Sequence, residues 1–190
     1  MRITGGEWAS RRLAGPRGGS AIRPTPDALR EQGFAVLAPI LDGAVFLDLF
    51  AGTGAISLEA LSRGAALAVT VERDRRALDL IRRNLAAFEV GKDRCELVSA
   101  VVRSTLTRLA QRGLRFDAGW CDPPFAWWVD GASDLEHAAS LGLFNSGAPV
   151  VLETPPHRKV SLLGFEVVRE LRGAVLLRVL PYPAKTQMSL

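Results

Sequence analysis

The sequence predicts an α/β fold, with helices on both faces of a mostly parallel seven-stranded sheet, and three features predict it. From residue 44 onward, short apolar runs alternate with amphipathic stretches, as in repeated β-α units. A glycine turn follows the first apolar run. The last two β-like runs are separated only by Arg172 and Gly173, so they must pair antiparallel and form a C-terminal hairpin.

The elements follow in a regular order. After Pro24 and Pro26, Leu29 and Phe34 share one helical face, so a helix is expected over Asp27–Leu37 with Asp27 as N-cap. The expected strands are Val45–Leu49, Ala66–Val71, Cys95–Val98, Phe116–Cys121, Val150–Glu153, Phe165–Leu171 and Ala174–Leu180. The other expected helices are Ala55–Ser62, Arg75–Phe88, Arg103–Gln111 and Leu135–Leu141. This Rossmann-like layout is shared by class I methyltransferases and can be mimicked by other open α/β sheets.

Length and composition set the organisation. With 190 residues, 48% of them apolar, the chain can bury one sizeable core, so we expect a basic N-terminal arm and helix at 1–38 and one compact domain at 39–190. Cys95 and Cys121 are the only cysteines and have no histidines at ligand spacing, so no disulfide or metal site is expected. No apolar run resembles a signal peptide or a membrane span, and we expect a cytoplasmic monomer.

Positive charge gathers near the N-terminus. Residues 1–31 hold six arginines and three acidic residues, while the whole chain has a formal charge of +4. An arm rich in glycine and arginine suits a polyanion, because each neutralised phosphate releases counterions. The same composition is typical of a solvated tail.

The glycine turn predicts a site for a nucleoside cofactor. The first strand leads into Phe50-Ala51-Gly52-Thr53-Gly54 and then a helix, and ligands of open α/β sheets bind at such strand ends. Gly52 and Gly54 allow close backbone approach, Asp48 can accept from an ammonium or an ordered water, and Glu72 ends the next strand, where an acid can bind both ribose hydroxyls. A tight turn packed on the sheet is the alternative for the glycines alone.

A dinucleotide site is the rival interpretation of this turn. Its fingerprint needs a third small residue where this chain has Ser57, and Asp48 would repel a pyrophosphate. S-adenosylmethionine carries an ammonium and no phosphate, so it tolerates an acid beside the glycines.

The fourth strand ends in Asp122-Pro123-Pro124-Phe125, which predicts a site for an amino group. Both prolines lack N–H donors, so the turn presents mainly acceptors, and an amine offers two donors. The Asp122 carboxylate and the Pro123 carbonyl would favour a pyramidal amine whose lone pair points at the methyl. Phe125 can stack on a base, and Trp127 and Trp128 can extend that surface. A loop with Asp as cap, prolines as breakers and Phe in the core is the alternative.

Together these residues resemble the bacterial RsmD family, which methylates the exocyclic N2 of guanine 966 in 16S ribosomal RNA. The resemblance covers nearly the whole chain and rests on Val45–Ala65, Val71-Glu72, Asp122–Phe125, Arg2-Ile3-Thr4-Gly5-Gly6, Arg12-Leu13 and Arg23-Pro24-Thr25 through Arg30-Glu31. It implies three sets of site residues. The cofactor S-adenosylmethionine would lie against Asp48, Phe50, Gly52, Gly54, Glu72, Arg73 and Ala100. The target guanine would lie against Asp122, Pro123, Pro124 and Phe125. The RNA backbone, in small-subunit particles, would contact Arg2, Arg11, Arg12, Arg23 and Arg30.

The chain departs from the family pattern at two places. Ser99-Ala100 stands where the family usually offers Asp or Asn to the adenine amine, and Gly33-Phe34-Ala35 replaces its usual Leu-Phe-Asn. The Asp-Pro-Pro-Phe turn also occurs in DNA adenine methyltransferases and resembles a turn of protein glutamine methyltransferases. Methylation of one of those amines, or an RNA-binding module without activity, are therefore the alternative functions.

Overall fold

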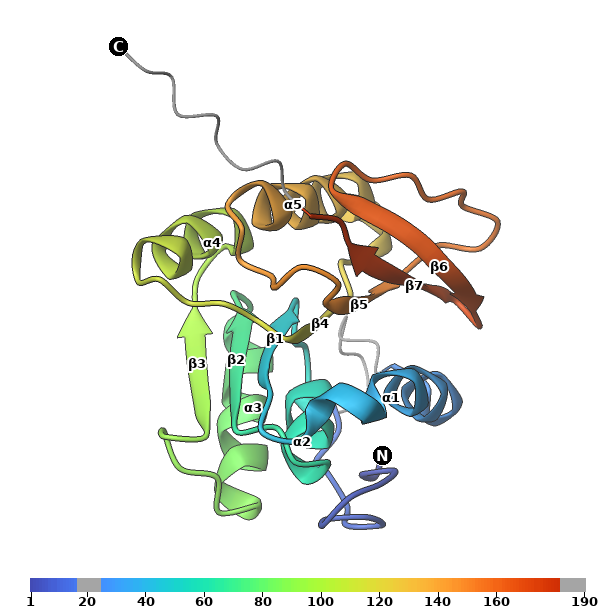
Figure 1. Cartoon of the computed structure of the whole chain (residues 1–190). Coiled ribbons are helices and arrows are strands. Elements are labelled where there is room, and N and C mark those ends of the chain that lie inside the picture. Colours follow the sequence, from blue (N-terminus) through green and yellow to red (C-terminus); the bar gives the residue numbers. More distant parts are fainter. Residues whose placement is uncertain (17–24, 182–190) are drawn as a thin grey trace.

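A seven-stranded sheet forms the centre of the molecule (Figure 1). The computed structural model describes residues 1–16 and 25–181, so Arg23 lies outside the described residues. The strand order is β3-β2-β1-β4-β5-β7-β6. The strands are β1 (Val45–Leu49), β2 (Leu67–Glu72), β3 (Cys95–Ser99), β4 (Ala118–Cys121), β5 (Pro149–Glu153), β6 (Phe165–Leu171) and β7 (Ala174–Val179). The first five strands in this order are parallel, and β7 runs antiparallel to both β5 and β6, which confirms the predicted sheet and hairpin.

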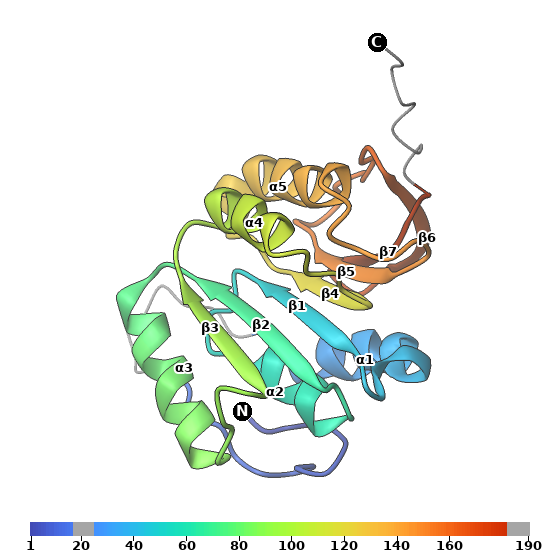
Figure 2. The ribbon, with the colours of Figure 1, turned by 60° about the vertical axis from the view of Figure 1, so that its left-hand side comes forward.

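Helices cover both faces of this sheet (Figure 2). One face carries α4 (Val102–Gln111) and α5 (Trp128–Ser140), and the other carries α1 (Asp27–Leu41), α2 (Ala55–Ser62) and α3 (Arg75–Ala87). Side chains of a strand alternate between the faces, so Phe46 of β1 joins one buried cluster while Leu47 and Leu49 join the other. No helix in the described part of the chain is long and apolar enough to cross a membrane.

Two helices, α1 and α5, differ from their predicted bounds by more than one residue. The N-cap of α1 is Pro26, whereas Asp27 is the first helical residue and bonds to Arg30 with its side chain; the helix continues past Leu37 to Leu41, so the predicted boundary at residue 38 falls inside it. Helix α5 begins at Trp128 instead of Leu135. A Cβ at Gly131, inside this helix, would lie 2.3 Å from Cβ of Pro123, so the packing of α5 on the turn requires a glycine there.

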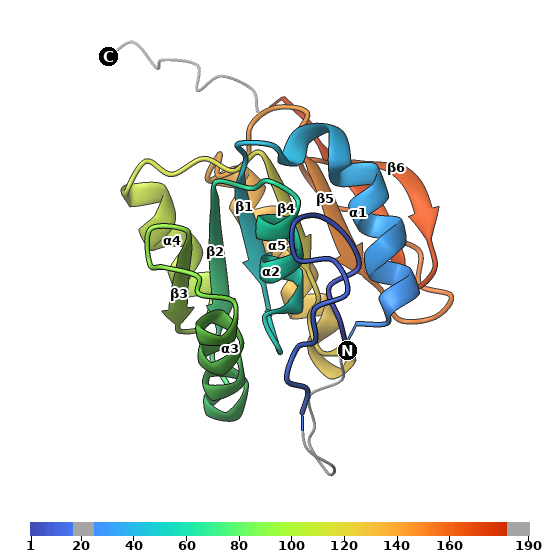
Figure 3. The ribbon, with the colours of Figure 1, turned by 90° about the horizontal axis from the view of Figure 1, so that it is seen from below.

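The N-terminal segment, residues 1–16, packs on the α2 and α3 side of the sheet (Figure 3). Arg2 and Arg12 form an isolated antiparallel bridge, and Ile3, Trp8 and Leu13 are buried. The Trp8 ring meets the ring of Phe88, just after α3, edge-on at a centroid distance of 5.3 Å. These residues are therefore part of the core and not a solvated tail.

Helix α1 packs on β4 through a glycine. The indole of Trp120 is almost completely buried, stacks on Phe34 at 5.4 Å and passes close to the backbone of Gly33. A Cβ at Gly33 would lie 2.4 Å from two ring atoms of Trp120. The Gly33-Phe34-Ala35 departure from the family pattern thus makes room for a large side chain on the neighbouring strand.

We expect Gly33→Ala to lower the free energy of unfolding by about 1–3 kcal/mol, because the helix or the indole must shift to admit the methyl group. Urea unfolding followed by tryptophan fluorescence measures this change. Gly15→Ala is the matched control, since nothing lies within 4 Å of a Cβ built there. An unfolding midpoint of Gly33→Ala equal to that of the wild type would contradict this prediction, because it would show that α1 and β4 admit the methyl group without loss of stability.

Candidate active site

A cleft opens where β1 and β4 end side by side. Leu49 pairs with Cys121 in parallel register, and the amide of Asp122 donates to the Leu49 carbonyl at 3.2 Å. The cleft is lined by Thr25, Asp48, Phe50, Ala51, Gly52, Thr53, Ala55, Ile56 and Asp122. The glycine turn and the Asp-Pro-Pro-Phe turn therefore border one cleft.

The glycine turn has an unusual backbone. Phe50, Gly52 and Gly54 all have positive φ, at 62°, 54° and 76°. A bulky residue such as Phe50 rarely adopts this conformation, so the surrounding structure must hold the turn in place. Gly54 directly precedes α2, and its amide donates to the Ala51 carbonyl at 2.8 Å. The turn thus leads the chain sharply from β1 into the helix and leaves the start of α2 at the cleft.

Glu72, at the end of β2, is tied to the glycine turn. One carboxylate oxygen accepts from the amide of Gly52 at 2.9 Å, and the other accepts from the amides of Arg73 and Asp74 at 2.6 and 2.8 Å. The Glu72 carbonyl accepts from the amide of Ala100 at 3.0 Å. The predicted ribose acid is therefore oriented by three backbone donors, with Ala100 beside it.

Asp48 lies beneath the turn and is only 1% exposed. One of its carboxylate oxygens accepts from the amide and from the hydroxyl of Ser57, at 3.0 and 2.5 Å, and that hydroxyl also meets Thr70 Oγ1 at 2.7 Å. Burial, opposed by the Ser57 bonds, raises the pKa of Asp48 to about 7. Ser57, the residue that fits a dinucleotide fingerprint poorly, is thus a hydrogen-bond donor to this acid.

The Asp-Pro-Pro-Phe turn leads into a short 3₁₀ helix, η1 (Phe125–Trp127). Pro123 is buried against Gly131, and the Pro124 carbonyl accepts from the amide of Trp127 at 2.8 Å. The Phe125 side chain is 48% exposed, so it is not part of the core. An aromatic ring therefore stands at the surface directly after Asp122 and the two prolines.

The two tryptophans after this turn have different surroundings. Trp127 is 51% exposed, and the Arg73 guanidinium lies over its ring, 4.5 Å from the centroid. Trp128 is buried, and its indole N–H donates to the backbone carbonyl of Glu153 at 2.8 Å. The predicted role of Trp128 in an exposed stacking surface is therefore wrong, because burial and this bond commit it to the core.

Asp122 shares its end of the cleft with other acids. The Thr25 hydroxyl lies 2.8 Å from Oε1 of Glu153 and 3.4 Å from Oδ2 of Asp122, and the Trp120 indole donates to the same Glu153 oxygen at 3.0 Å. Burial first, and then the negative charges of Glu153 and Asp48, raise the pKa of Asp122 well above its ordinary value. The site thus contains a second carboxyl group in contact with Asp122.

Glu153 and Thr25 are two residues of the cleft for which the sequence predicted no role. A signal for Glu153 was present, since it ends an otherwise apolar strand next to β4 in a parallel sheet, and polar residues at such ends meet at the ligand edge. Thr25 gave no comparable signal, because its distance from Glu153 along the chain hides their contact.

The predicted RNA-binding arginines divide into two groups. Arg2, Arg11 and Arg12 are exposed, although Arg11 also donates to the Ala87 carbonyl at 2.9 Å and lies over the Phe88 ring. Arg30 is 0% exposed, so its predicted contact with RNA backbone is wrong in this structure.

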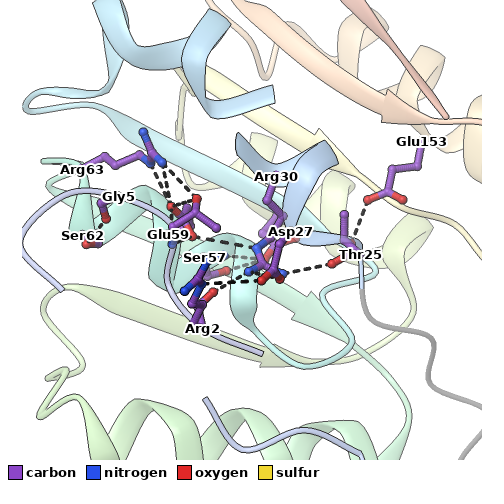
Figure 4. A network of polar contacts seen from close by, with 12 residues as sticks. Arg2, Gly5, Thr25, Asp27, Arg30, Ser57, Glu59, Ser62, Arg63 and Glu153 are labelled. Carbon is purple, nitrogen blue, oxygen red and sulfur yellow. Dashed lines mark hydrogen bonds and ion pairs between the residues drawn. The ribbon is translucent and has the colours of Figure 1, made fainter. Parts of the chain in front are cut away.

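Arg30 instead joins the arm to the helices (Figure 4). Its guanidinium donates to the carbonyls of Thr25 and Arg2 and to the Asp27 carboxylate, and its Nε lies 3.8 Å from the buried carboxylate of Glu59. Arg30 therefore positions the segment that carries Thr25 into the cleft.

The cysteines lie away from any metal-binding arrangement. Both Cys95 and Cys121 are free and buried, and burial raises the pKa of each thiol, to about 11 for Cys95. Within residues 1–16 and 25–181, no three His, Cys, Asp or Glu side chains could hold a metal ion.

The sheet order and the cleft at the ends of β1 and β4 define the class I methyltransferase fold. A solved structure titled a putative methyltransferase yhhF from Escherichia coli matches with a TM-score of 0.76 and 32% identity, over 95% of this chain and 98% of that one. The family model described as conserved hypothetical protein 95 matches residues 1–178. The chain belongs to this family, and its resemblance to the RsmD family is confirmed.

Two curated relatives are similar to part of the chain. Ribosomal RNA small subunit methyltransferase D of Escherichia coli is 42% identical over 125 residues, which is 66% of this chain and 60% of that protein. A putative rRNA methyltransferase of Bacillus subtilis, YlbH, is 35% identical over 125 residues, 66% of this chain and 67% of that protein. The match therefore spans less than two thirds of the Escherichia coli relative.

Asp48 gives a testable pH dependence of stability. The folded, ligand-free protein retains a proton on Asp48 that the unfolded chain has released, so the free energy of unfolding falls as pH rises from about 4 to about 7. A shift of about three pKa units corresponds to roughly 4 kcal/mol. Asp48→Asn keeps an acceptor for Ser57 without the charge, and we expect its stability to decrease less with pH than that of the wild type.

Urea unfolding at several pH values across this range measures the difference. Asp79→Asn is the control, because this exposed partner of Arg82 should leave the pH dependence unchanged. Parallel curves for Asp48→Asn and the wild type would contradict the raised pKa of Asp48.

Proposed function

We propose that the protein transfers a methyl group from S-adenosylmethionine to the exocyclic N2 of a guanine in 16S ribosomal RNA, at the family's position 966. The observation that carries the proposal is the single cleft that joins Asp48 and the glycine turn to Asp122. The names of the relatives, one a small-subunit RNA methyltransferase and one a putative rRNA methyltransferase, support RNA as the substrate class.

The residues on the glycine side of the cleft fit S-adenosylmethionine. Glu72 is held by three backbone donors in an orientation that can accept both ribose hydroxyls. Gly52 has no Cβ to obstruct the ligand, and Asp48 would bind its ammonium, which favours the ionised form of that carboxyl. The Arg73 guanidinium and Ala100 would lie against the adenosine. When bound, this cofactor supplies a methyl group on a sulfonium leaving group.

The Asp122 side of the cleft fits an amino group on a flat base. Pro123 and Pro124 have no N–H, so the Asp122 carboxylate and the Pro123 carbonyl are the acceptors proposed for the amine. Two acceptors would hold the amine with its lone pair directed at the methyl, and the exposed ring of Phe125 would stack on the base. Catalysis would then come from in-line positioning and from the negative charge of the carboxyl groups beside the developing ammonium.

RNA contacts would come from the N-terminal segment. Arg2, Arg11 and Arg12 are exposed on the segment that leads toward Thr25 and the cleft, and Arg23 belongs to the same stretch of sequence. Their charge suits phosphates, which position an RNA without reading its sequence. The base would be read by the cleft itself.

We expect the purified protein to transfer labelled methyl from S-adenosylmethionine to small ribosomal subunits of an Escherichia coli strain that lacks its methyltransferase D. Mass mapping of the RNA should find one N2-methylguanine at position 966, and free 16S RNA compared with assembled subunits shows which form is the substrate. Label in N6-methyladenine, or in a protein glutamine, would replace the guanine assignment. RNA binding without label would indicate a module without activity.

Asp122→Ala should reduce turnover at least about a hundredfold, since it removes the acceptor that orients the amine. The variant should still fold, because it removes one of several buried like charges. Calorimetry should find binding of S-adenosylmethionine nearly unchanged. Asp130→Ala, at an exposed position on α5, is the control, and wild-type turnover of Asp122→Ala would exclude the proposed role.

A further inference from the structure

We propose that Glu153 is a positioning residue for Asp122: the two carboxyl groups share one proton, and Thr25 and Trp120 hold Glu153 in the orientation that this sharing requires. The proposal rests on the proposed methyl transfer. It adds Glu153 of β5 and Thr25, just before α1, to the machinery of that reaction.

Glu153 is fixed at both ends by tryptophans. It is 7% exposed at the end of β5, next to β4, where Leu152 pairs with Cys121. The Trp120 indole donates to its carboxyl oxygen Oε1 at 3.0 Å, and the Trp128 indole donates to its backbone carbonyl at 2.8 Å. The side chain and the backbone of Glu153 are thus each held by a hydrogen bond from another element, so the carboxyl group points in a defined direction, which a glutamate that only fills space does not need.

The second contact at Oε1 comes from Thr25. Its hydroxyl lies 2.8 Å from Glu153 Oε1 and 3.4 Å from Asp122 Oδ2, so it stands between the two acids. The Thr25 backbone carbonyl accepts from buried Arg30, which holds this residue in place. A hydroxyl has a single proton to donate, and the shorter distance assigns it to Glu153. The Thr25 proton is therefore not available to the two carboxyl groups, and a hydrogen bond between them requires a separate proton.

The charges around the pair favour one shared proton. Asp48 on β1 and Glu153 on β5 both act on Asp122 as negative charges, and a hydrogen bond between the Asp122 and Glu153 side chains favours the protonated form of Asp122. Glu72 on β2 acts on Asp48 in the same direction. Two carboxyl groups in contact cannot both ionise readily, and a shared proton relieves the repulsion.

A shared proton would prepare Asp122 for the reaction. With the proton held between the two carboxyl groups, the other Asp122 oxygen remains an acceptor for the amine. The amine lone pair forms the new N–C bond, the S–C bond breaks, and its electron pair stays on sulfur. The methylated ammonium then gives one proton to Asp122, so the pair passes from one proton to two and later releases one to solvent.

The test is the pH profile of turnover for Glu153→Gln, measured with labelled S-adenosylmethionine and unmethylated small subunits. The amide keeps the acceptor for Trp120 and Thr25 but removes the acid and its charge. We expect the alkaline limb, on which the wild-type pair loses its shared proton, to be absent, and the plateau rate to fall about tenfold. Binding of S-adenosylmethionine should change less than twofold.

Glu166→Gln is the matched control, because this exposed glutamate on β6 pairs with Arg178 away from the cleft. It should have the wild-type profile. Thr25→Val should reduce the plateau rate without an equal loss of cofactor affinity, and Thr25→Ser, which keeps the hydroxyl, should recover most of it. A folded Glu153→Gln protein with the wild-type pH profile would overturn the proposal.

A measurement without substrate separates this proposal from the proposed function. Infrared difference spectra of the ligand-free protein should show a protonated carboxyl band that titrates well above the ordinary range, at lower pH in Glu153→Gln and unchanged in Glu166→Gln. If Glu153→Gln fails to fold, Trp120→Phe removes one donor to Glu153 and should shift the same band. Absence of transferase activity in the wild-type protein would overturn the proposed function. A carboxyl band whose titration is the same in the wild type, Glu153→Gln and Trp120→Phe would overturn the shared proton.

Discussion

The structure depends on how it holds three carboxyl groups in one cleft. Parallel strands in the order β1-β4-β5 place Asp48, Asp122 and Glu153 at neighbouring strand ends, where their charges repel one another. Donors from elsewhere hold these acids: Ser57 on α2 bonds to Asp48, Thr25 and Trp120 bond to Glu153, and the Thr25 hydroxyl also lies 3.4 Å from Asp122. A sulfonium and an ammonium in this cleft would offset the repulsion, so the same crowding that costs folding free energy would favour a cationic cofactor.

Buried charge on the opposite side of α2 brings Thr25 to these acids. The Glu59 carboxylate is fully buried and accepts from the Thr4 backbone, the Thr4 hydroxyl and the Arg63 guanidinium, and Arg30 lies beside it. Arg30 then donates to the Thr25 carbonyl. Breaking a buried pair leaves an uncompensated charge, so this cluster favours one arrangement of the N-terminal segment over others. The geometry of the cleft thus depends on contacts made by residues far from it in sequence.

The sequence predicted the elements better than the contacts. Alternation of apolar runs, the glycine turn and the Arg172-Gly173 hairpin determine the order of strands, and the site edge of the sheet follows from that order. Arg30 was predicted to contact RNA because it is positively charged, but the charge of a residue does not show which groups it contacts in the folded protein. Its spacing with Leu29, Gly33, Phe34 and Leu37 places it on the buried face of α1, where Glu59 and backbone carbonyls compensate it. Trp128 was misassigned because its hydrogen bond to the Glu153 carbonyl is a tertiary contact that no local pattern carries.

The N-terminal segment is bonded to both sides of the cleft. Asn84 on α3 is buried; its amide donates to the carbonyls of Ala14 and Thr53 at 3.1 and 3.0 Å, and its oxygen accepts from the Ala14 amide. Thr53 belongs to the glycine turn, whereas Thr25, farther along the chain, reaches Glu153 and Asp122. Residues 1–16 therefore contact the cofactor side through Asn84, and Arg30, which donates to the carbonyls of both Arg2 and Thr25, links them to the acceptor side. Any displacement of this segment by a polyanion would be transmitted to both sides at once, which ties the proposed RNA contact to the geometry of transfer.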